Sequence, residues 1–197
     1  MEQYWTNNEK LESKIKEIGY SILNNSFVFY SDEGVFSKNK VDTGSDLLIR
    51  TYLNKHNESL KILDVGCGYG VIGITLSKLT DSVVHMIDIN KRSIHLANMN
   101  AKKQKCNAGA FYSDAYSEIK EAYDIIITNP PIRVGKSKLL EILRGAKDYL
   151  SDSGELWFVI RKDQGALSTM KLLESEYKIE IKEKKKGYLI FCANKSN

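Results

Sequence analysis

The sequence predicts an α/β fold built around one mostly parallel β-sheet. Short apolar runs alternate with helical stretches over most of the chain, a pattern typical of βαβ units that place helices on both faces of a sheet. Two apolar runs near the C-terminus are joined by the short segment 183–187, which indicates an antiparallel hairpin. A glycine-rich turn follows the first run of the alternating region, at a strand end where open α/β sheets bind ligands.

The predicted sheet has seven strands. They are expected over residues 61–64, 83–87, 110–112, 124–128, 155–160, 178–182 and 188–192. The helices between them are expected over residues 71–79, 91–103, 136–150 and 165–174. Together with a helix that precedes the first strand, these elements make up a predicted domain over residues 41–197.

Residues 1–40 read differently and are predicted to form a small N-terminal extension. Residues 9–18 are expected to form a short helix. Residues 26–30 and 35–36 are expected to pair as a β-hairpin around a turn at 31–34. The segment 41–45, Val-Asp-Thr-Gly-Ser, then opens an amphipathic helix whose expected inner face is Leu47, Leu48 and Tyr52.

Composition limits the class of protein. A chain of 197 residues can hold one well-buried domain, and its net charge of +4 permits an anionic partner such as RNA without requiring one. No apolar run approaches the roughly 18 residues that span a bilayer, and the N-terminus lacks the pattern of a secretion signal. We therefore expect a cytoplasmic protein without membrane contact. Cys67, Cys106 and Cys192 lie far apart with no C-x-x-C pair, so no metal site is expected.

The segment 64–70, Asp-Val-Gly-Cys-Gly-Tyr-Gly, joins a strand to a helix and is the first candidate binding site. Its glycines let the backbone approach a ligand, and the following helix N-terminus favours an anionic group. The run from Gly68 to Gly73 formally matches the dinucleotide fingerprint, which leaves NAD as one possible ligand. Counted from Gly66, however, Val71 stands where the third glycine belongs. The carboxylate of Asp64 would repel a pyrophosphate and attract the ammonium of a methionine moiety, which favours S-adenosylmethionine.

Acidic residues at two further strand ends support a nucleoside-type ligand. Asp88 ends the second predicted strand, where a carboxylate accepts hydrogen bonds from ribose hydroxyls, and Ile89 follows it. This spacing also fits NAD, so it does not decide between the two cofactors. Asp114 and Ala115 follow the third strand and are expected beside the adenine, although a loop aspartate without a ligand remains the alternative.

Asn129, Pro130 and Pro131 end the fourth predicted strand in a rigid corner. An amino group attached to an aromatic base or an amide is a poor nucleophile, because its lone pair is delocalised. The side-chain oxygen of Asn129 and the carbonyl of Pro130 can accept its two hydrogens and direct the nitrogen toward a methyl donor, which needs no metal or strong base. We therefore predict that Asn129, Pro130 and Pro131 form the catalytic loop, with Asn129 also beside the cofactor.

With these motifs, the chain from about residue 35 resembles the small-domain class I N-methyltransferases. The likeness lies in the segments 41–45, 64–70 and 129–136 together with Asp88 and Asp114. It is closest to the ribosomal RNA small-subunit methyltransferase C group in single-domain form, which methylates the exocyclic N2 of a guanine. The resemblance implies a Rossmann-like fold with S-adenosylmethionine as cofactor. It implies cofactor contacts from Asp64, Gly66, Cys67, Gly68, Gly70, Asp88, Ile89, Asp114, Ala115 and Asn129.

The expected substrate-contacting residues depart from the family pattern at one position. The residue after the two prolines is usually an aromatic that stacks on the target base, whereas this chain has Ile132. Phe36 in the N-terminal extension is a candidate for the missing aromatic surface. Arg133 and Lys136 are candidates for contacts with RNA phosphate, and the basic segment 182–186 is either a further RNA contact or a solvated hairpin.

The function predicted from the sequence is an N-methyltransferase for guanine N2 in small-subunit ribosomal RNA, with the RNA or the small subunit as partner. Alternatives within the class are adenine N6 in DNA or tRNA, and protein glutamine. Alternatives from other classes are a NAD-dependent oxidoreductase, which Asp64 and the Asn-Pro-Pro corner disfavour, and a non-catalytic RNA-binding module. The sequence leaves open whether the protein is a monomer or a homodimer.

Overall fold

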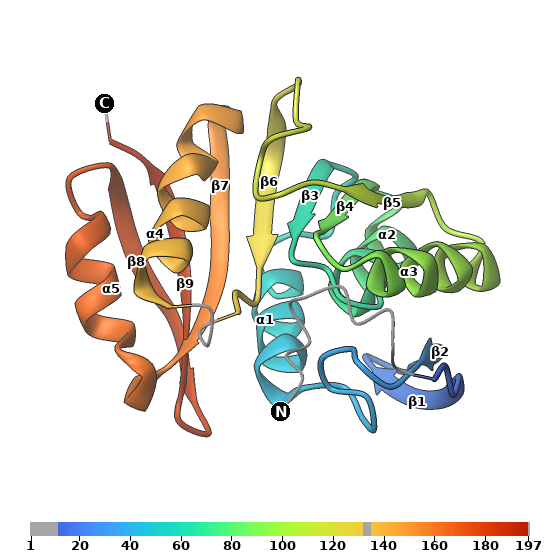
Figure 1. Cartoon of the computed structure of the whole chain (residues 1–197). Helices are drawn as coiled ribbons and strands as arrows, with labels where there is room; N and C mark the ends of the chain where they lie inside the picture. The colour runs from blue at the N-terminus through green and yellow to red at the C-terminus, as the bar shows by residue number, and fades with distance from the viewer. Residues whose placement is uncertain (1–11, 132–134, 197) are drawn as a thin grey trace.

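The fold was analysed in a computed structural model that describes residues 12–131 and 135–196 (Figure 1). Its core is a seven-stranded sheet with the strand order β5-β4-β3-β6-β7-β9-β8. The strands are β3 (Lys61–Val65), β4 (Val83–Asp88), β5 (Ala108–Tyr112), β6 (Tyr123–Thr128), β7 (Leu150–Arg161), β8 (Tyr177–Lys185) and β9 (Tyr188–Lys195). Strands β3 to β7 pair in parallel, whereas β9 pairs antiparallel with both β7 and β8. The predicted mostly parallel sheet and its C-terminal hairpin are confirmed.

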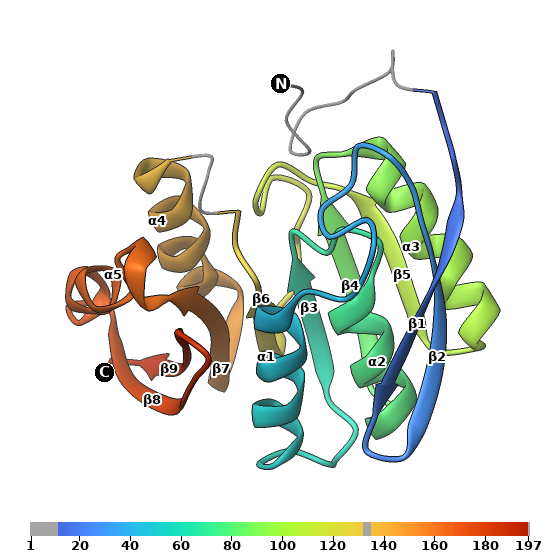
Figure 2. The ribbon, with the colours of Figure 1, turned by 90° about the horizontal axis from the view of Figure 1, so that it is seen from below.

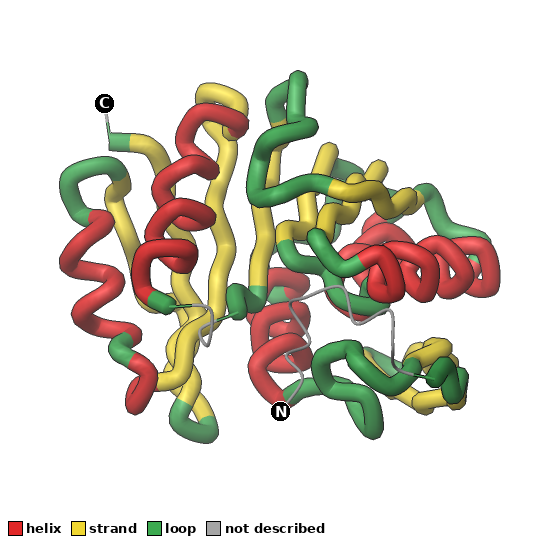
Figure 3. Tube along the Cα trace, in the orientation of Figure 1, coloured by secondary structure: helices red, strands yellow, loops and turns green. Residues whose placement is uncertain are grey.

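Helices cover both faces of the sheet, as predicted (Figure 3). The helices α1 (Thr43–Leu53), α2 (Val71–Thr80) and α3 (Lys91–Gln104) pack on one face. The helices α4 (Lys136–Gly145) and α5 (Ala166–Leu173) pack on the other. The helix predicted over 136–150 ends earlier, because a 3-10 turn at Ala146–Tyr149 leads directly into β7. A second 3-10 turn, Lys162–Gln164, precedes α5.

Two hydrophobic layers follow from this arrangement. Alternate strand residues face opposite sides, so Ile125 and Ile127 join the layer under α1 and α2, while Ile126 joins the layer under α4 and α5. These isoleucines are almost fully buried, as expected for a parallel strand covered on both faces. The layers hold the carboxyl ends of β3, β4 and β6 in fixed positions at one edge of the sheet.

The N-terminal elements differ from the prediction. The helix expected over 9–18 is wrong for its described part, because β1 (Lys16–Ile22) begins there. The expected strand at 26–30 exists as β2 (Asn25–Ser31), but it pairs with β1 and not with residues 35–36, which lie in a turn. Burial explains the error: Ile18, Tyr20 and Ile22 alternate with exposed residues and face the core, which is the two-residue period of a strand.

The hairpin β1–β2 packs beside α3, outside the main sheet (Figure 2). The Tyr20 hydroxyl donates to Asp46 at 2.9 Å, which joins the hairpin to α1. Asn100 of α3 accepts a hydrogen bond from the backbone N–H of Tyr30 at 2.6 Å and donates to the carbonyls of Tyr30 and Tyr69. The hairpin side chains belong to the same hydrophobic cluster as α1 and α2. The division into an extension over 1–40 and a domain over 41–197 stays a prediction.

The described helices are too short or too polar to cross a membrane.

Candidate active site

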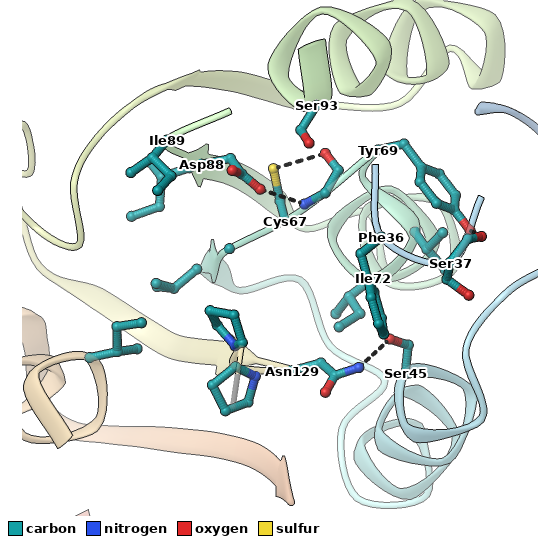
Figure 4. A pocket seen from close by; sticks show the side chains of 18 of the residues that line it. Phe36, Ser37, Ser45, Cys67, Tyr69, Ile72, Asp88, Ile89, Ser93 and Asn129 are labelled. Atoms are coloured by element: carbon teal, nitrogen blue, oxygen red, sulfur yellow. Dashed lines mark hydrogen bonds between the residues drawn. The ribbon is translucent and has the colours of Figure 1, made fainter. Parts of the chain in front are cut away.

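A pocket opens at the carboxyl ends of β3, β4 and β6 (Figure 4). Its walls come from the glycine loop, from the residues after β4, β5 and β6, and from the segment before and within the first turn of α1. The predicted site residues that line it are Phe36, Gly66, Cys67, Gly68, Asp88, Ile89, Asp114, Ala115, Asn129, Pro130 and Pro131. The fold therefore brings the two predicted loops to one cavity.

The glycine loop presents open backbone to this pocket. The N–H groups of Gly66 and Cys67 donate to the carbonyl of Ile87 at 2.8 and 3.0 Å, which ties the loop to β4. Gly66 and Gly68 have φ values of 72° and 55°, a region that favours glycine. A side chain built at Gly68 would meet no atom within 4 Å, and one at Gly66 would approach only Pro131. The loop is thus a cradle with free space above it, as a bound ligand requires.

Gly70 and Cys67 were both expected at the cofactor, and of the two only Cys67 lines the pocket. Gly70 is the N-cap of α2, and a side chain there would lie 2.6 Å from Ile74, so this glycine serves close packing under the loop. Cys67 lines the pocket, but burial raises the pKa of its thiol well above the ordinary value. A thiol held protonated in this way is a packing group and a poor nucleophile.

Asp64 lies beneath the glycine loop and is completely buried. Its Oδ2 accepts a hydrogen bond from the N–H of Gly73 in α2 at 2.9 Å, while its Oδ1 is buried and accepts none from the described residues. Burial raises the pKa of this carboxyl to about 7. An unpaired buried carboxylate close beneath the pocket wall fits a ligand that brings positive charge, such as the ammonium and sulfonium of S-adenosylmethionine. Direct contact between Asp64 and the cofactor stays a prediction.

Asp88 ends β4 at the wall of the pocket (Figure 4). Its Oδ2 accepts from the N–H of Gly68 at 2.9 Å, and its Oδ1 accepts from the N–H of Asn90 at 2.8 Å. Burial raises the pKa of this carboxyl, while the backbone hydrogen bonds oppose that shift. A carboxylate has about four acceptor positions and these contacts do not use all of them, so the residue can both hold the loop and accept from a ribose hydroxyl. The sequence predicted the second role and not the first.

Asp114 and Ala115 form the wall after β5, beside Ile89. Ala115 has a φ of 47°, unusual for a residue other than glycine, and the Ser113 hydroxyl donates to its carbonyl at 2.7 Å. Lys138 of α4, which the sequence did not single out, lies 2.5 Å from an Asp114 oxygen and lines the same wall. The ion pair connects α4 to the expected adenine side of the pocket.

Asn129 follows β6 directly, and its side-chain amide is held from one side. Its Nδ2 donates to Ser45 Oγ at 2.9 Å (Figure 4). The same nitrogen donates to Asp42 Oδ2, also at 2.9 Å. The Oδ1 of Asn129 accepts no hydrogen bond from the described residues. The Thr128 hydroxyl donates to the carbonyl of Val65 at 2.7 Å, which fixes the end of β6 against the end of β3. The amide therefore presents an available acceptor oxygen at a fixed strand end.

Asp42 and Ser45 are site residues that the sequence did not assign. Asp42 is the N-cap of α1 and accepts from the N–H of Ser45 at 3.1 Å. The segment 41–45 was predicted as a helix start and formed part of the family resemblance, but neither observation gave Asp42 or Ser45 a role in the site. The two residues lie 87 and 84 positions from Asn129, so no local spacing joins them to it.

The structure describes two of the four residues that were predicted to contact the substrate. Phe36 lines the pocket with 40% of its surface exposed, in agreement with a position at the pocket mouth. Lys136 is exposed at the start of α4. Ile132 and Arg133 lie outside the described residues.

A seven-stranded sheet of this order, a glycine loop after β3 and an Asn-Pro-Pro corner after the neighbouring β6 define a methyltransferase fold. Comparison with known proteins agrees: a family model described as "Methyltransferase small domain" matches residues 26–192. The chain belongs to this family. Membership confirms the predicted enzyme class, a methyltransferase, and with it S-adenosylmethionine as the methyl donor.

Two sequence relatives illustrate the range of the family. The chain is 42% identical to "Uncharacterized protein YbxB" of Bacillus subtilis (strain 168), with 98% of each chain covered. It is 36% identical to ribosomal RNA small subunit methyltransferase C of Haemophilus influenzae (strain Rd) over 71% of this chain but only 43% of the relative. The chain thus spans less than half the length of that relative.

The fold is similar to that of a solved methyltransferase. The "T. Thermophilus 16S rRNA N2 G1207 methyltransferase (RsmC) in complex with AdoMet and Guanosine" superposes with a TM-score of 0.85 at 23% identity. The match covers 94% of this chain and 52% of that chain. At this identity the likeness supports the fold, and the substrate has to be argued from the site.

Proposed function

We propose that this protein transfers a methyl group from S-adenosylmethionine to an exocyclic amino group of a nucleobase, with guanine N2 of small-subunit ribosomal RNA as the substrate. The observation that carries the proposal is the Asn129 amide, whose nitrogen is engaged by Asp42 and Ser45 while its oxygen remains available as an acceptor. A planar amino group has two N–H donors and a delocalised lone pair. It is the kind of nucleophile for which an acceptor in this position is useful.

Different residues bind different parts of the cofactor. The open backbone at Gly66 and Gly68 cradles the cofactor, and Asp88 accepts from its ribose hydroxyls. When ionised, the buried carboxyl of Asp64 stabilises the positively charged methionine end through space. When bound, S-adenosylmethionine supplies an electrophilic methyl group on a sulfonium.

Asn129 and Pro130 then act on the substrate. Asn129 Oδ1 accepts one hydrogen of the amino group and the Pro130 carbonyl accepts the other, which turns the nitrogen lone pair toward the methyl carbon. The lone pair forms the new N–C bond, the electron pair of the broken C–S bond stays on sulfur, and one amino proton leaves to water. Orientation of this kind supplies on the order of several kcal/mol of the barrier without a strong base.

Three observations favour an RNA base over the other planar amino groups. Relatives at 32 to 36% identity are named ribosomal RNA small subunit methyltransferase C. Phe36 offers a partly exposed aromatic ring at the pocket, where a base displaced from its stack can lie against it. The end of β8 and the turn after it carry Lys184, Lys185 and Lys186, which are exposed and form no ion pair within the described part of the chain.

The proposal is tested with small ribosomal subunits from cells that lack this protein. Incubation with the purified enzyme and tritiated S-adenosylmethionine is expected to label the ribosomal RNA at one nucleotide, and digestion to nucleosides is expected to yield N2-methylguanosine. Asn129→Ala is expected to lose turnover by orders of magnitude while its affinity for the cofactor is kept.

Asn107→Ala, at an exposed position before β5, is the matched control and is expected to remain active. Labelling of a different base, of DNA or of a protein would assign another substrate. A fully active Asn129→Ala would refute the proposed role of the loop.

A further inference from the structure

We propose that Asp42 and Ser45 are positioning residues that fix the Asn129 amide for catalysis, an inference that rests on the proposed function of Asn129. Both belong to the start of α1, and both accept a hydrogen bond from Asn129 Nδ2 at 2.9 Å. The two acceptors use both N–H bonds of the amide. The side chain is thereby held at one end by two contacts from a different element.

The chemistry of Asp42 makes the orientation of the amide unambiguous. The two ends of an asparagine amide have nearly the same shape, and a rotation of 180° would present N–H donors to a substrate amino group. An ionised carboxylate is an acceptor only, so it favours the orientation in which Nδ2 faces Asp42 and Oδ1 faces away. Without such a partner, the oriented state would be one of two competing rotamers.

The charge of Asp42 also strengthens the acceptor. A hydrogen bond from an amide N–H to a carboxylate draws electron density toward the amide oxygen, because hydrogen-bonded groups in sequence polarise one another. The substrate nitrogen gains positive charge as it forms the bond to the methyl carbon. A more electron-rich Oδ1 therefore stabilises the transition state more than the ground state, which raises kcat.

Gly44 shows that the space around Asp42 is fully used. A side-chain carbon at this position would lie 2.9 Å from Asp42 Oδ2 and 2.9 Å from Cε1 of Tyr188 in β9. The absence of a side chain at residue 44 lets Asp42 reach Asn129 while Tyr188 covers it from the sheet. The position of the carboxylate thus depends on three separate segments of the chain.

The first test compares single hydroxyl deletions in α1, with methyl transfer to small ribosomal subunits as the assay. Ser45→Ala removes one contact to Asn129 and leaves the backbone N–H that Asp42 caps. It is expected to lower kcat about tenfold, the effect of losing one hydrogen bond, with the KM for the subunit and the Kd for the cofactor within about twofold. Thr51→Val is the matched control, because the Thr51 hydroxyl donates only to Leu47 within the same helix. It is expected to keep the kcat of the wild type.

The second test separates positioning from a general structural effect. Asp42→Ala is expected to lower kcat more than Ser45→Ala, and Asp42→Asn is expected to restore only part of it, because an asparagine oxygen still accepts at the helix cap but carries no charge. In the Asn129→Ala background, Ser45→Ala is expected to cause no further loss, since the residue acts only through Asn129. An equal loss in both backgrounds, or an unchanged kcat for Ser45→Ala beside an inactive Asn129→Ala, overturns the inference.

A third readout requires no substrate. In protein labelled with ¹⁵N-asparagine, the side-chain amide signal that disappears in Asn129→Ala is expected to shift in Ser45→Ala and to stay in place in Thr51→Val. An unshifted signal in Ser45→Ala overturns the inference even where methyl transfer is never observed. Failure of the proposed function would instead show as a wild-type enzyme that does not label ribosomal RNA.

Discussion

The backbone N–H of Gly68 donates to Oδ2 of Asp88 at 2.9 Å, which joins the middle of the glycine loop to the end of the neighbouring strand. One carboxylate thus shapes the loop and stands at the wall of the pocket that receives the cofactor. Replacement of this residue is therefore expected to affect binding in two ways at once.

Asp88→Ala is expected to lower the affinity for S-adenosylmethionine at least tenfold, about 1.4 kcal/mol, because the loop and the ribose hydroxyls both lose an acceptor. Titration calorimetry measures the effect. Asp152→Ala, an exposed aspartate in β7, is the control and is expected to bind like the wild type. Equal affinity in Asp88→Ala would contradict the assigned role.

Two glycines with similar open surroundings offer a matched pair. A methyl group placed at either Gly68 or Gly109 would meet no atom within 4 Å, but only Gly68 has a positive φ. Gly68→Ala is expected to destabilise the fold by about 1–2 kcal/mol and to weaken cofactor binding, because the methyl group would occupy the cradle. Gly109→Ala in β5 is expected to leave both unchanged. Thermal unfolding with and without the cofactor checks both, and equal behaviour of the two variants would count against the cradle.

Asp64 gives the fold a definite pH dependence. Its pKa rises from 3.8 to about 7 on folding, so between these values the folded state keeps a proton that the unfolded state has lost. The free energy of unfolding therefore falls as pH rises from about 4 to about 7, and the loss is complete above that range. Asp64→Asn keeps an acceptor for Gly73 and is expected to remove this slope in urea titrations across pH 4 to 8. Equal slopes in both proteins would show that the carboxyl does not titrate there.

Asp64→Asn also tests the cofactor assignment. Loss of the buried charge removes an attraction for the ammonium and sulfonium groups, so calorimetry at pH 8 is expected to show weaker binding of S-adenosylmethionine. The hydrogen bond to Gly73 should persist in this variant, which keeps the loop in place. Unchanged affinity would mean that the carboxylate serves only to hold α2.

The three lysines at the end of β8 and in the turn after it are expected to contact RNA phosphate. Changing Lys184, Lys185 and Lys186 together to glutamine should raise the KM for the ribosomal subunit and reduce its salt dependence, with kcat nearly unchanged. The control changes Lys78, Lys102 and Lys120, which lie elsewhere on the molecule. The same KM in both triple variants would indicate a merely solvated turn.

The main sheet could be predicted because its strands are short apolar runs whose order and spacing leave few arrangements. The N-terminal hairpin could not, since its turn places Leu23 and Asn24 at φ values of 46° and 63°. Asparagine accepts this conformation readily but leucine does so rarely, so the turn carries no glycine signal. The Ser-Asp-Glu-Gly segment at 31–34 has a stronger turn signal, so the hairpin was predicted around the wrong turn.

For the site, the sequence indicated the residues that follow each strand, because parallel strands bring their carboxyl ends together. It could not indicate Asp42 and Ser45 as partners of Asn129, since that contact depends on how α1 docks against β6. It indicated Asp64 at the strand end beside the loop, but it did not indicate that this side chain is fully buried below the loop. Side-chain direction at a strand end is a property of packing and not of spacing.

Asn100 has a consequence for how this molecule can be cut or engineered. Its single side chain binds the backbone of Tyr30 in the hairpin and the carbonyl of Tyr69 in the glycine loop. Cleavage or an insertion in β2 is therefore expected to disturb the glycine loop. Removal of the hairpin would leave the buried side chain of Asn100 without its Tyr30 partners, beside an apolar cluster. The small hairpin is therefore a poor point for fusing tags or exchanging modules.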